Sequence, residues 1–143
     1  MVGVLVVTHG RLAEALISSV QFLAGNLEKV KGVSHWPKDR ESQIKDRIRR
    51  KVAELDDGDG VVILTDILGG TPTNLSLSCF ENENVHVVTG VNLPMLLTLS
   101  SYQKGKSLGE VSRLVKKAGR RSITLANTVL GWRQVRKWKN GDG

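Results

Sequence analysis

A histidine and an aspartate at the ends of two apolar segments are the residues in this sequence best suited to chemistry. His9 follows the apolar run of residues 2–7, and Asp66 follows the apolar run of residues 61–64. A carboxylate that accepts the N–H of a neutral imidazole fixes the tautomer and orientation of the ring, and it leaves the other ring nitrogen free to act as a nucleophile. The two residues together predict covalent chemistry on histidine.

Glycine-rich backbone follows both residues. Gly10 comes directly after His9, and Gly69-Gly70-Thr71 comes shortly after Asp66. Glycine lets the backbone approach a ligand closely, and free amides ahead of a helix bind the oxygens of a phosphoryl group. We therefore predict phosphoryl transfer through His9, with Asp66 and Thr71 as its catalytic partners. Gly10, Gly69 and Gly70 are predicted to form the phosphate-binding backbone.

Alternating strands and helices are expected to bring these residues together. Short apolar runs predict strands at residues 2–9, 30–34, 61–65, 85–89 and 122–126, and helical periodicity predicts helices at 11–24, 40–55, 71–80, 94–102 and 107–119. Pro72 and Pro94 are expected in the first turns of their helices, and Ser107 followed three residues later by Glu110 has the form of a capping box. This alternation favours an α/β fold with a doubly wound, mostly parallel sheet flanked by helices. In such a sheet the carboxyl ends of the strands share one edge, where ligands bind. We expect segments 8–10, 65–72 and 89–94 to meet at that edge.

The composition is that of a single soluble domain with a basic end. The chain has 143 residues, 40% of them hydrophobic and 24% charged, and no apolar run approaches the roughly 20 residues that a membrane span needs. From residue 120 onward there are six basic residues and one acidic residue, which account for +5 of the net charge of +7. We expect a domain over residues 1–126 and a basic tail over 127–143. The single cysteine, Cys79, is consistent with a cytoplasmic location.

Several other classes of site are disfavoured. The sequence has no Gly-x-x-x-x-Gly-Lys-Ser/Thr segment and no Gly-x-Gly-x-x-Gly, which argues against a nucleotide kinase, and it has no Gly-x-Ser-x-Gly elbow of a hydrolase. His35, in a loop beside Trp36-Pro37, and His86, inside a strand, are not expected to join the site. They are not spaced as metal ligands and are given structural roles. The acidic stretch 56–60 lacks the spaced series of a calcium loop and predicts a turn. We expect no cofactor, no metal and no nucleic-acid partner.

The order and spacing of the motifs resemble the IIA component of the mannose family of the bacterial phosphoenolpyruvate:sugar phosphotransferase system (PTS). The resemblance runs from about residue 2 to residue 126. The matching motifs are Thr8-His9-Gly10, Asp66, Gly69-Gly70-Thr71-Pro72-x-Asn74 and Gly90-Val91-Asn92-Leu93-Pro94-Met95-Leu96.

The resemblance implies a phosphohistidine carrier. His9 would accept a phosphoryl group from the phosphohistidine of the carrier HPr and pass it to a histidine of a IIB domain, which serves the membrane partners IIC and IID. Asp66 would orient His9, and the hydroxyl of Thr71 would lie close to the phosphoryl group. Members of the family are usually homodimers that exchange a strand near the C-terminal end, for which residues 122–126 are the candidate here.

The sequence departs from the family pattern at its end. A basic segment with Trp132 and Trp138 stands where many relatives continue through a linker into a IIB domain. HPr also presents a rather basic face, so charge attraction is not expected to dominate docking to this basic chain.

Two further functions remain open from the residues alone. The first is a regulatory phosphocarrier, or the phosphoryl-donor subunit of dihydroxyacetone kinase, which would use the same chemistry with a different acceptor. The second belongs to another class: a non-catalytic flavodoxin-like module that binds an anion or a nucleotide at the same edge of the sheet. Each motif taken singly also has an ordinary structural role, as a surface histidine, a helix cap or a turn. The prediction of function therefore depends on their convergence.

Overall fold

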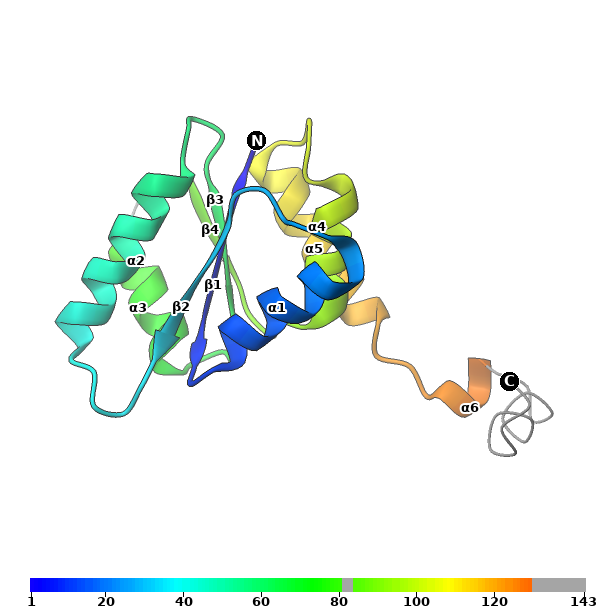
Figure 1. Ribbon diagram of the computed structural model, residues 1–143, viewed down its shortest axis with the longest axis horizontal. Helices are drawn as coiled ribbons and strands as arrows, with labels where there is room; N and C mark the ends of the chain where they lie inside the picture. Colours follow the sequence, from blue (N-terminus) through cyan, green and yellow to red (C-terminus); the bar gives the residue numbers. More distant parts are fainter. Residues whose placement is uncertain (81–83, 130–143) are drawn as a thin grey trace.

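The fold is a four-stranded sheet with helices on both faces (Figure 1). The computed structural model describes residues 1–80 and 84–129. The elements in chain order are β1 (Gly3–His9), α1 (Leu12–Ala24), β2 (Val30–His35), α2 (Glu41–Leu55), β3 (Val61–Thr65), α3 (Thr71–Cys79), β4 (Val85–Val88), α4 (Leu93–Tyr102), α5 (Leu108–Arg121) and α6 (Ala126–Val129).

All pairings in the sheet are parallel, and the strand order is β2-β1-β3-β4. The predicted parallel α/β sheet is therefore confirmed. β1 and β3 lie side by side at the centre, with Val7 of β1 opposite Thr65 of β3. The carboxyl ends of the strands meet at one edge, toward which the arrowheads of β1 and β2 point at the bottom of Figure 1. His9, at the end of β1, and Asp66, directly after β3, consequently lie at neighbouring strand ends.

Two apolar layers hold the sheet between its helices. On one face, alternate residues of β1 and β3 pack against α1, α4 and α5. On the other face, the remaining residues of the same strands pack against Ile44, Ile48 and Leu55 of α2 and Leu75 of α3. Burial on both faces explains the nearly continuous apolar sequence of the two central strands. It also makes the strand ends a rigid base for the polar residues that follow them.

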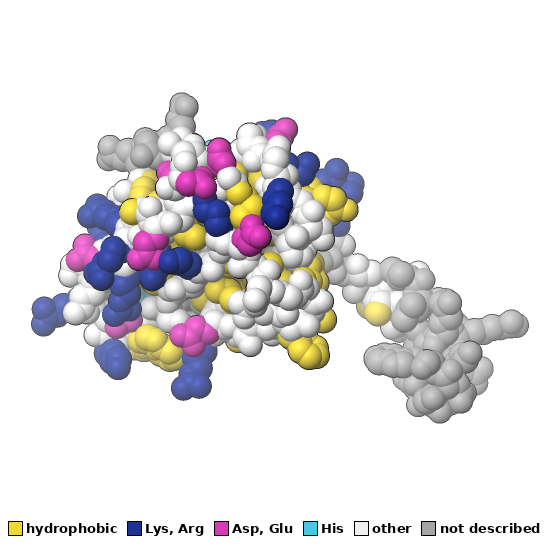
Figure 2. Space-filling view, turned by 45° about the horizontal axis from the view of Figure 1, so that its top comes forward, with side chains coloured by type: hydrophobic (Ala, Val, Ile, Leu, Met, Phe, Trp, Pro, Cys, Tyr) yellow, Lys and Arg dark blue, Asp and Glu magenta, His cyan; other side chains and the backbone are white. Residues whose placement is uncertain are grey.

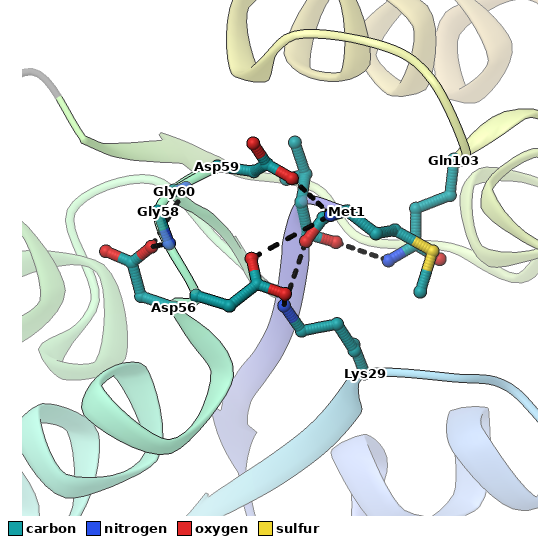
Figure 3. Close-up of polar contacts among 9 residues, drawn as sticks. Met1, Lys29, Asp56, Gly58, Asp59, Gly60 and Gln103 are labelled. Carbon is teal, nitrogen blue, oxygen red and sulfur yellow. Dashed lines mark hydrogen bonds and ion pairs between the residues drawn. The ribbon is translucent and has the colours of Figure 1, made fainter.

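The opposite edge of the sheet is fastened by polar contacts (Figure 3). The carboxylate of Asp56 accepts the amide hydrogens of Gly58 and Gly60 at 2.9 and 3.0 Å, so the acidic stretch is the turn that the sequence predicts. Lys29 bridges this turn to the start of β1, since its ammonium lies 2.7 Å from Asp57 and donates to the carbonyl of Met1 at 2.9 Å. Figure 2 shows that Lys and Arg side chains are interspersed with Asp and Glu on the face that includes this edge.

The local signals for helix starts are confirmed. Pro72 and Pro94 lie in the first turns of α3 and α4. Ser107 and Glu110 form the predicted capping box of α5, in which the Ser107 hydroxyl accepts the Glu110 amide and the Glu110 carboxylate accepts the Ser107 amide. Among the described residues, no helix has the length and apolarity that a membrane crossing requires.

In the single chain, residues 122–126 do not form the predicted strand. Residues 123–125 have no regular structure, and Ala126 begins α6. The segment leads away from the body of the protein (Figure 1), and the side chains of Ile123 and Leu125 are 84% and 69% exposed. Alternating apolar residues favour a strand only where a neighbouring strand is available for pairing, and this segment pairs with none of the described strands. Trp132 and Trp138 lie outside the described residues, and the boundary between domain and tail remains a prediction.

Candidate active site

His9 and Asp66 form a hydrogen-bonded pair at the carboxyl edge of the sheet. The Nδ1 of His9 lies 2.7 Å from Oδ2 of Asp66, and the backbone amide of His9 donates to the same oxygen at 2.9 Å. The other carboxylate oxygen accepts the amide of Ile67 at 3.0 Å. The Asp66 side chain is only 11% exposed, whereas that of His9 is 45% exposed. The structure thus brings together the two residues on which the predicted chemistry depends.

The protonation state of Asp66 decides which nitrogen of His9 carries hydrogen. Burial by itself raises the pKa of the Asp66 carboxyl, but the hydrogen bonds from the amide and ring of His9 outweigh burial, and the net pKa lies below the ordinary 3.8. An ionised carboxylate only accepts hydrogen bonds, so Nδ1 of His9 is the protonated nitrogen. The lone pair of neutral His9 therefore resides on Nε2, the nitrogen that does not contact Asp66.

The loop after β3 passes close to the His9 ring at Gly70. A side-chain carbon at position 70 would lie 3.0 Å from Cε1 of His9, which is tighter than ordinary van der Waals contact. The loop is held in place by Thr73, whose hydroxyl lies 2.6 Å from the Thr65 hydroxyl and also donates to the carbonyl of Ile67 at 2.6 Å. A larger residue here would press on His9 and Ile67, so glycine is the residue that fits without moving either side chain.

Thr71 and Gly69 belong to the same loop. Thr71 is the first residue of α3, directly after Gly70, so its amide lies in the first turn of that helix. Gly69 has a positive φ of +83°, and its carbonyl accepts the side-chain amide of Asn74 at 3.2 Å. The structure therefore brings Asp66, Gly69, Gly70 and Thr71 together in the loop that contacts His9. Their contacts with a phosphoryl group remain a prediction.

Gly10 turns the chain from β1 into α1. Its φ is +55°, which a glycine adopts without strain, and its amide donates to the carbonyl of His35 at 2.8 Å. The amide of Ala13 in the first turn of α1 donates to the hydroxyl of buried Thr8 at 2.7 Å. The hydrogen bonds of this segment therefore fix the position of His9 from both sides along the chain.

The third predicted strand end, at residues 89–94, stabilises the site indirectly. The amide of Val91 donates to the carbonyl of Thr65 at 2.9 Å, just before Asp66. The Asn92 side chain accepts the amide of Met95 at 3.1 Å and donates to the carbonyl of Gly119 at 3.3 Å. This motif joins the end of β3 to α4 and α5.

His35 is the site residue that the sequence interpretation missed. It ends β2 directly opposite His9, and the centroids of the two rings are 5.5 Å apart with an interplanar angle of 70°. The expectation that His35 lies in a loop away from the site is wrong, because β2 extends one residue further than predicted. A histidine that ends the first predicted strand and a histidine directly after the second were the signal that could have found this contact. His86 is bonded to the hydroxyl of Ser112 at 2.8 Å and keeps its structural role.

No cluster of three or more histidine, cysteine, aspartate or glutamate side chains in the described parts of the chain is arranged to hold a metal ion. Cys79 lies on α3, where burial raises the pKa of its thiol. That shift disfavours the thiolate form that a nucleophilic cysteine requires.

The depressed pKa of Asp66 predicts a pH-dependent contribution to stability. This contribution should be fully present above the ordinary pKa of 3.8 and should disappear as the pH falls through the lower pKa of the folded state. Asp66→Asn should lower the free energy of unfolding by about 1–2 kcal/mol at pH 7, and the difference from wild type should shrink below pH 3.8. Urea denaturation of both proteins at pH 7 and pH 3 measures this difference. A difference that does not change with pH would contradict the assigned interaction.

Comparisons with known proteins agree with this geometry. The family model described as "PTS system fructose IIA component" (EIIA-man) matches residues 3–116. The chain is 31% identical over 124 residues to the "PTS system mannose-specific EIIAB component" of Escherichia coli K12. That match covers 85% of this chain but only 38% of the relative.

Solved structures of IIA proteins share the fold. The crystal structure of phosphotransferase system component EIIA from Streptococcus agalactiae matches with a TM-score of 0.80 and 26% identity, over 90% of this chain and 99% of that chain. The PTS IIA protein associated with the fucose utilization operon of Streptococcus pneumoniae matches with a TM-score of 0.76 and 30% identity, over 89% and 95% of the two chains. The chain therefore belongs to the mannose-type EIIA family of the sugar phosphotransferase system.

Proposed function

We propose that the protein is a cytoplasmic phosphohistidine carrier. His9 accepts a phosphoryl group from phospho-HPr and passes it to a histidine of a IIB domain during PTS sugar uptake. The observation that carries this proposal is the 2.7 Å contact of His9 Nδ1 with Asp66, which leaves Nε2 as the nucleophile. Membership of the EIIA family supports a role as a phosphotransferase component.

The transfer step follows from the geometry of the His9–Asp66 pair. The lone pair of His9 Nε2 attacks phosphorus, a new P–N bond forms, and the P–N bond of the donor breaks with its electron pair returning to the donor imidazole. The His9 ring becomes cationic, because Nδ1 keeps its hydrogen. Asp66 stabilises that cation through the same hydrogen bond, and Gly69, Gly70 and Thr71 are proposed to donate hydrogen bonds to the phosphoryl oxygens.

The exposure of the site favours a protein as donor and acceptor. His9 is nearly half exposed, and the apolar side chains of Ile67 and Leu68, in the loop that follows Asp66, are 57% and 78% exposed. Exposed apolar side chains beside a reactive group are suited to contact with a partner protein. Apolar contact also does not depend on charge attraction between this basic chain and the basic face of HPr.

The replacement His9→Ala should abolish phosphate acceptance, because it removes the nucleophile and leaves the core intact. Asp66→Asn should slow transfer about 10–100-fold, because an amide holds the ring less well and does not stabilise its positive charge. Intact mass after incubation with phosphoenolpyruvate, enzyme I and HPr measures the product, which should carry one acid-labile phosphoryl group. Equal labelling of the His9→Ala protein and wild type would identify a different residue as the acceptor.

A neutral polar side chain at Leu68 should weaken docking without changing the chemistry. Leu68→Asn removes the apolar contact without adding a charge, and it is expected to raise the KM for phospho-HPr about tenfold and to leave kcat within about twofold of wild type. Leu77→Asn is the matched control, because Leu77 is 55% exposed on α3. Initial rates over a range of HPr concentrations give both constants. The same KM for the two variants would show that Leu68 does not contact the donor.

We also propose that the protein forms a homodimer in which residues 122–126 pair with the sheet of a second copy. Within the described residues, β4 pairs with β3 alone and forms one edge of the sheet. Ile123 and Leu125 belong to a segment without regular structure and are largely exposed in the single chain. Burial of these side chains beside β4 of the second copy would supply the missing neighbour for the segment.

Light scattering tests the homodimer directly. The molar mass should be twice the 15.6 kDa of the chain, and combined Ile123→Asp and Leu125→Asp replacements should return it to that of the monomer, because charges would then be buried beside β4. The Leu77→Asp protein should keep the mass of the dimer. A wild-type protein that is monomeric at all concentrations would contradict the proposal.

A further inference from the structure

We infer that His35 is a positioning residue for His9, which fixes the plane of the reactive ring while Asp66 fixes its tautomer. The inference rests on the proposed role of His9 as the phosphoryl carrier. It assigns to His35 a part in the transfer that neither the motifs of the sequence nor the His9–Asp66 pair contains.

The contact between the two histidines is built into the sheet. His35 is the parallel partner of His9 in the register of β1 and β2. Its carbonyl accepts the amide of Gly10 at 2.8 Å, so the two strand ends are tied together immediately beyond the rings. The rings meet edge to face, with centroids 5.5 Å apart and an interplanar angle of 70°, which is a favourable arrangement for aromatic groups.

The hydrogen bond to Asp66 does not by itself determine the direction of Nε2. A single N–H···O contact at Nδ1 permits the ring to rotate about the line that joins the two atoms. The edge contact with His35 opposes that rotation, and the close approach of Gly70 to Cε1 limits the space at another point on the ring. Two contacts from the loop after β3 and one from β2 thus define where the Nε2 lone pair points, and in-line attack on phosphorus depends on that direction.

His35 is itself held by packing and by its chain neighbours. Its Nδ1 is buried and has no hydrogen-bond partner among the described residues. The turn that follows it is fixed by Asp39, whose carboxylate accepts the amide of Trp36 at 2.9 Å and lies 3.5 Å from the guanidinium of Arg47. Because no hydrogen bond of the described chain uses Nδ1, we infer that His35 acts through van der Waals contact of its ring with His9.

Two replacements distinguish the effect of the His35 ring from the effect of its nitrogen atoms. His35→Phe keeps an aromatic ring and removes the unpaired nitrogen, so it should unfold at the same temperature as wild type or at a higher one. His35→Ala removes the ring. His86→Ala is the matched control, because His86 lies in β4 and contacts Ser112.

The measurement is the rate of His9 phosphorylation at saturating phospho-HPr. Because a small misplacement of a reacting atom is costly, His35→Ala should lower kcat about tenfold with little change in KM, while the Phe and His86→Ala proteins should stay within about twofold of wild type. An unchanged rate for His35→Ala would overturn the inference. So would an equal loss for His35→Phe and His35→Ala, which would assign the effect to the polar atoms.

NMR relaxation of the His9 imidazole in the unphosphorylated proteins gives a second readout. Wild type, His35→Phe and His35→Ala should all show His9 protonated at Nδ1, because Asp66 fixes the tautomer, whereas the order parameter of the His9 ring should fall in His35→Ala alone because the ring is less well held. An equal order parameter of the His9 ring in wild type and His35→Ala would overturn the positioning role. Failure of wild type to accept phosphate would instead refute the proposed function, and the relaxation data would still decide whether His35 orders the ring.

Discussion

The hydrogen bond between His9 and Asp66 is the interaction that gives the carboxyl edge of the sheet its chemical character. It joins the ends of two adjacent parallel strands that are 57 residues apart in sequence. It selects the protonated nitrogen of the imidazole, and it keeps the carboxylate ionised although the carboxylate is largely buried. Without it, His9 would be an exposed histidine with either nitrogen available. With it, Nε2 is the single nucleophilic atom.

The fold supplies the rigidity that this interaction needs. β1 and β3 are buried on both faces, so the strand ends that carry His9 and Asp66 have little freedom to separate. Hydroxyls of Thr65 and Thr73 fix the loop that brings Gly70 to the ring. The reactive atom remains accessible because no element of the described chain covers His9, while Ile67 and Leu68 expose apolar surface in the adjacent loop. A buried frame under an open site suits the proposed carrier, which would meet two protein partners in turn.

Much of this architecture could be predicted from local sequence. The apolar runs at residues 2–7 and 61–64, Pro72 and Pro94 in first helical turns, and the Ser107–Glu110 capping box each act within a few residues and are all confirmed. The failures involve partners distant in sequence. Ile123 and Leu125 alternate as in a strand, but pairing requires a neighbouring strand that local sequence does not encode. The contact of His35 with His9 depends on the register between β1 and β2, and Trp36-Pro37 had indicated only a loop.

The most direct test of this account is to locate the phosphoryl group at atomic resolution. The protein would be labelled with ¹⁵N-histidine and phosphorylated by phosphoenolpyruvate, enzyme I and HPr, and the coupling of phosphorus to the imidazole nitrogens would be measured by NMR. We predict a single phosphorylated histidine, His9, with phosphorus bonded to Nε2 and hydrogen retained on Nδ1. Phosphorus on Nδ1 of His9 would show that Asp66 does not hold that nitrogen in the reacting state. Phosphorylation of His35 or His86 instead of His9 would refute the account altogether.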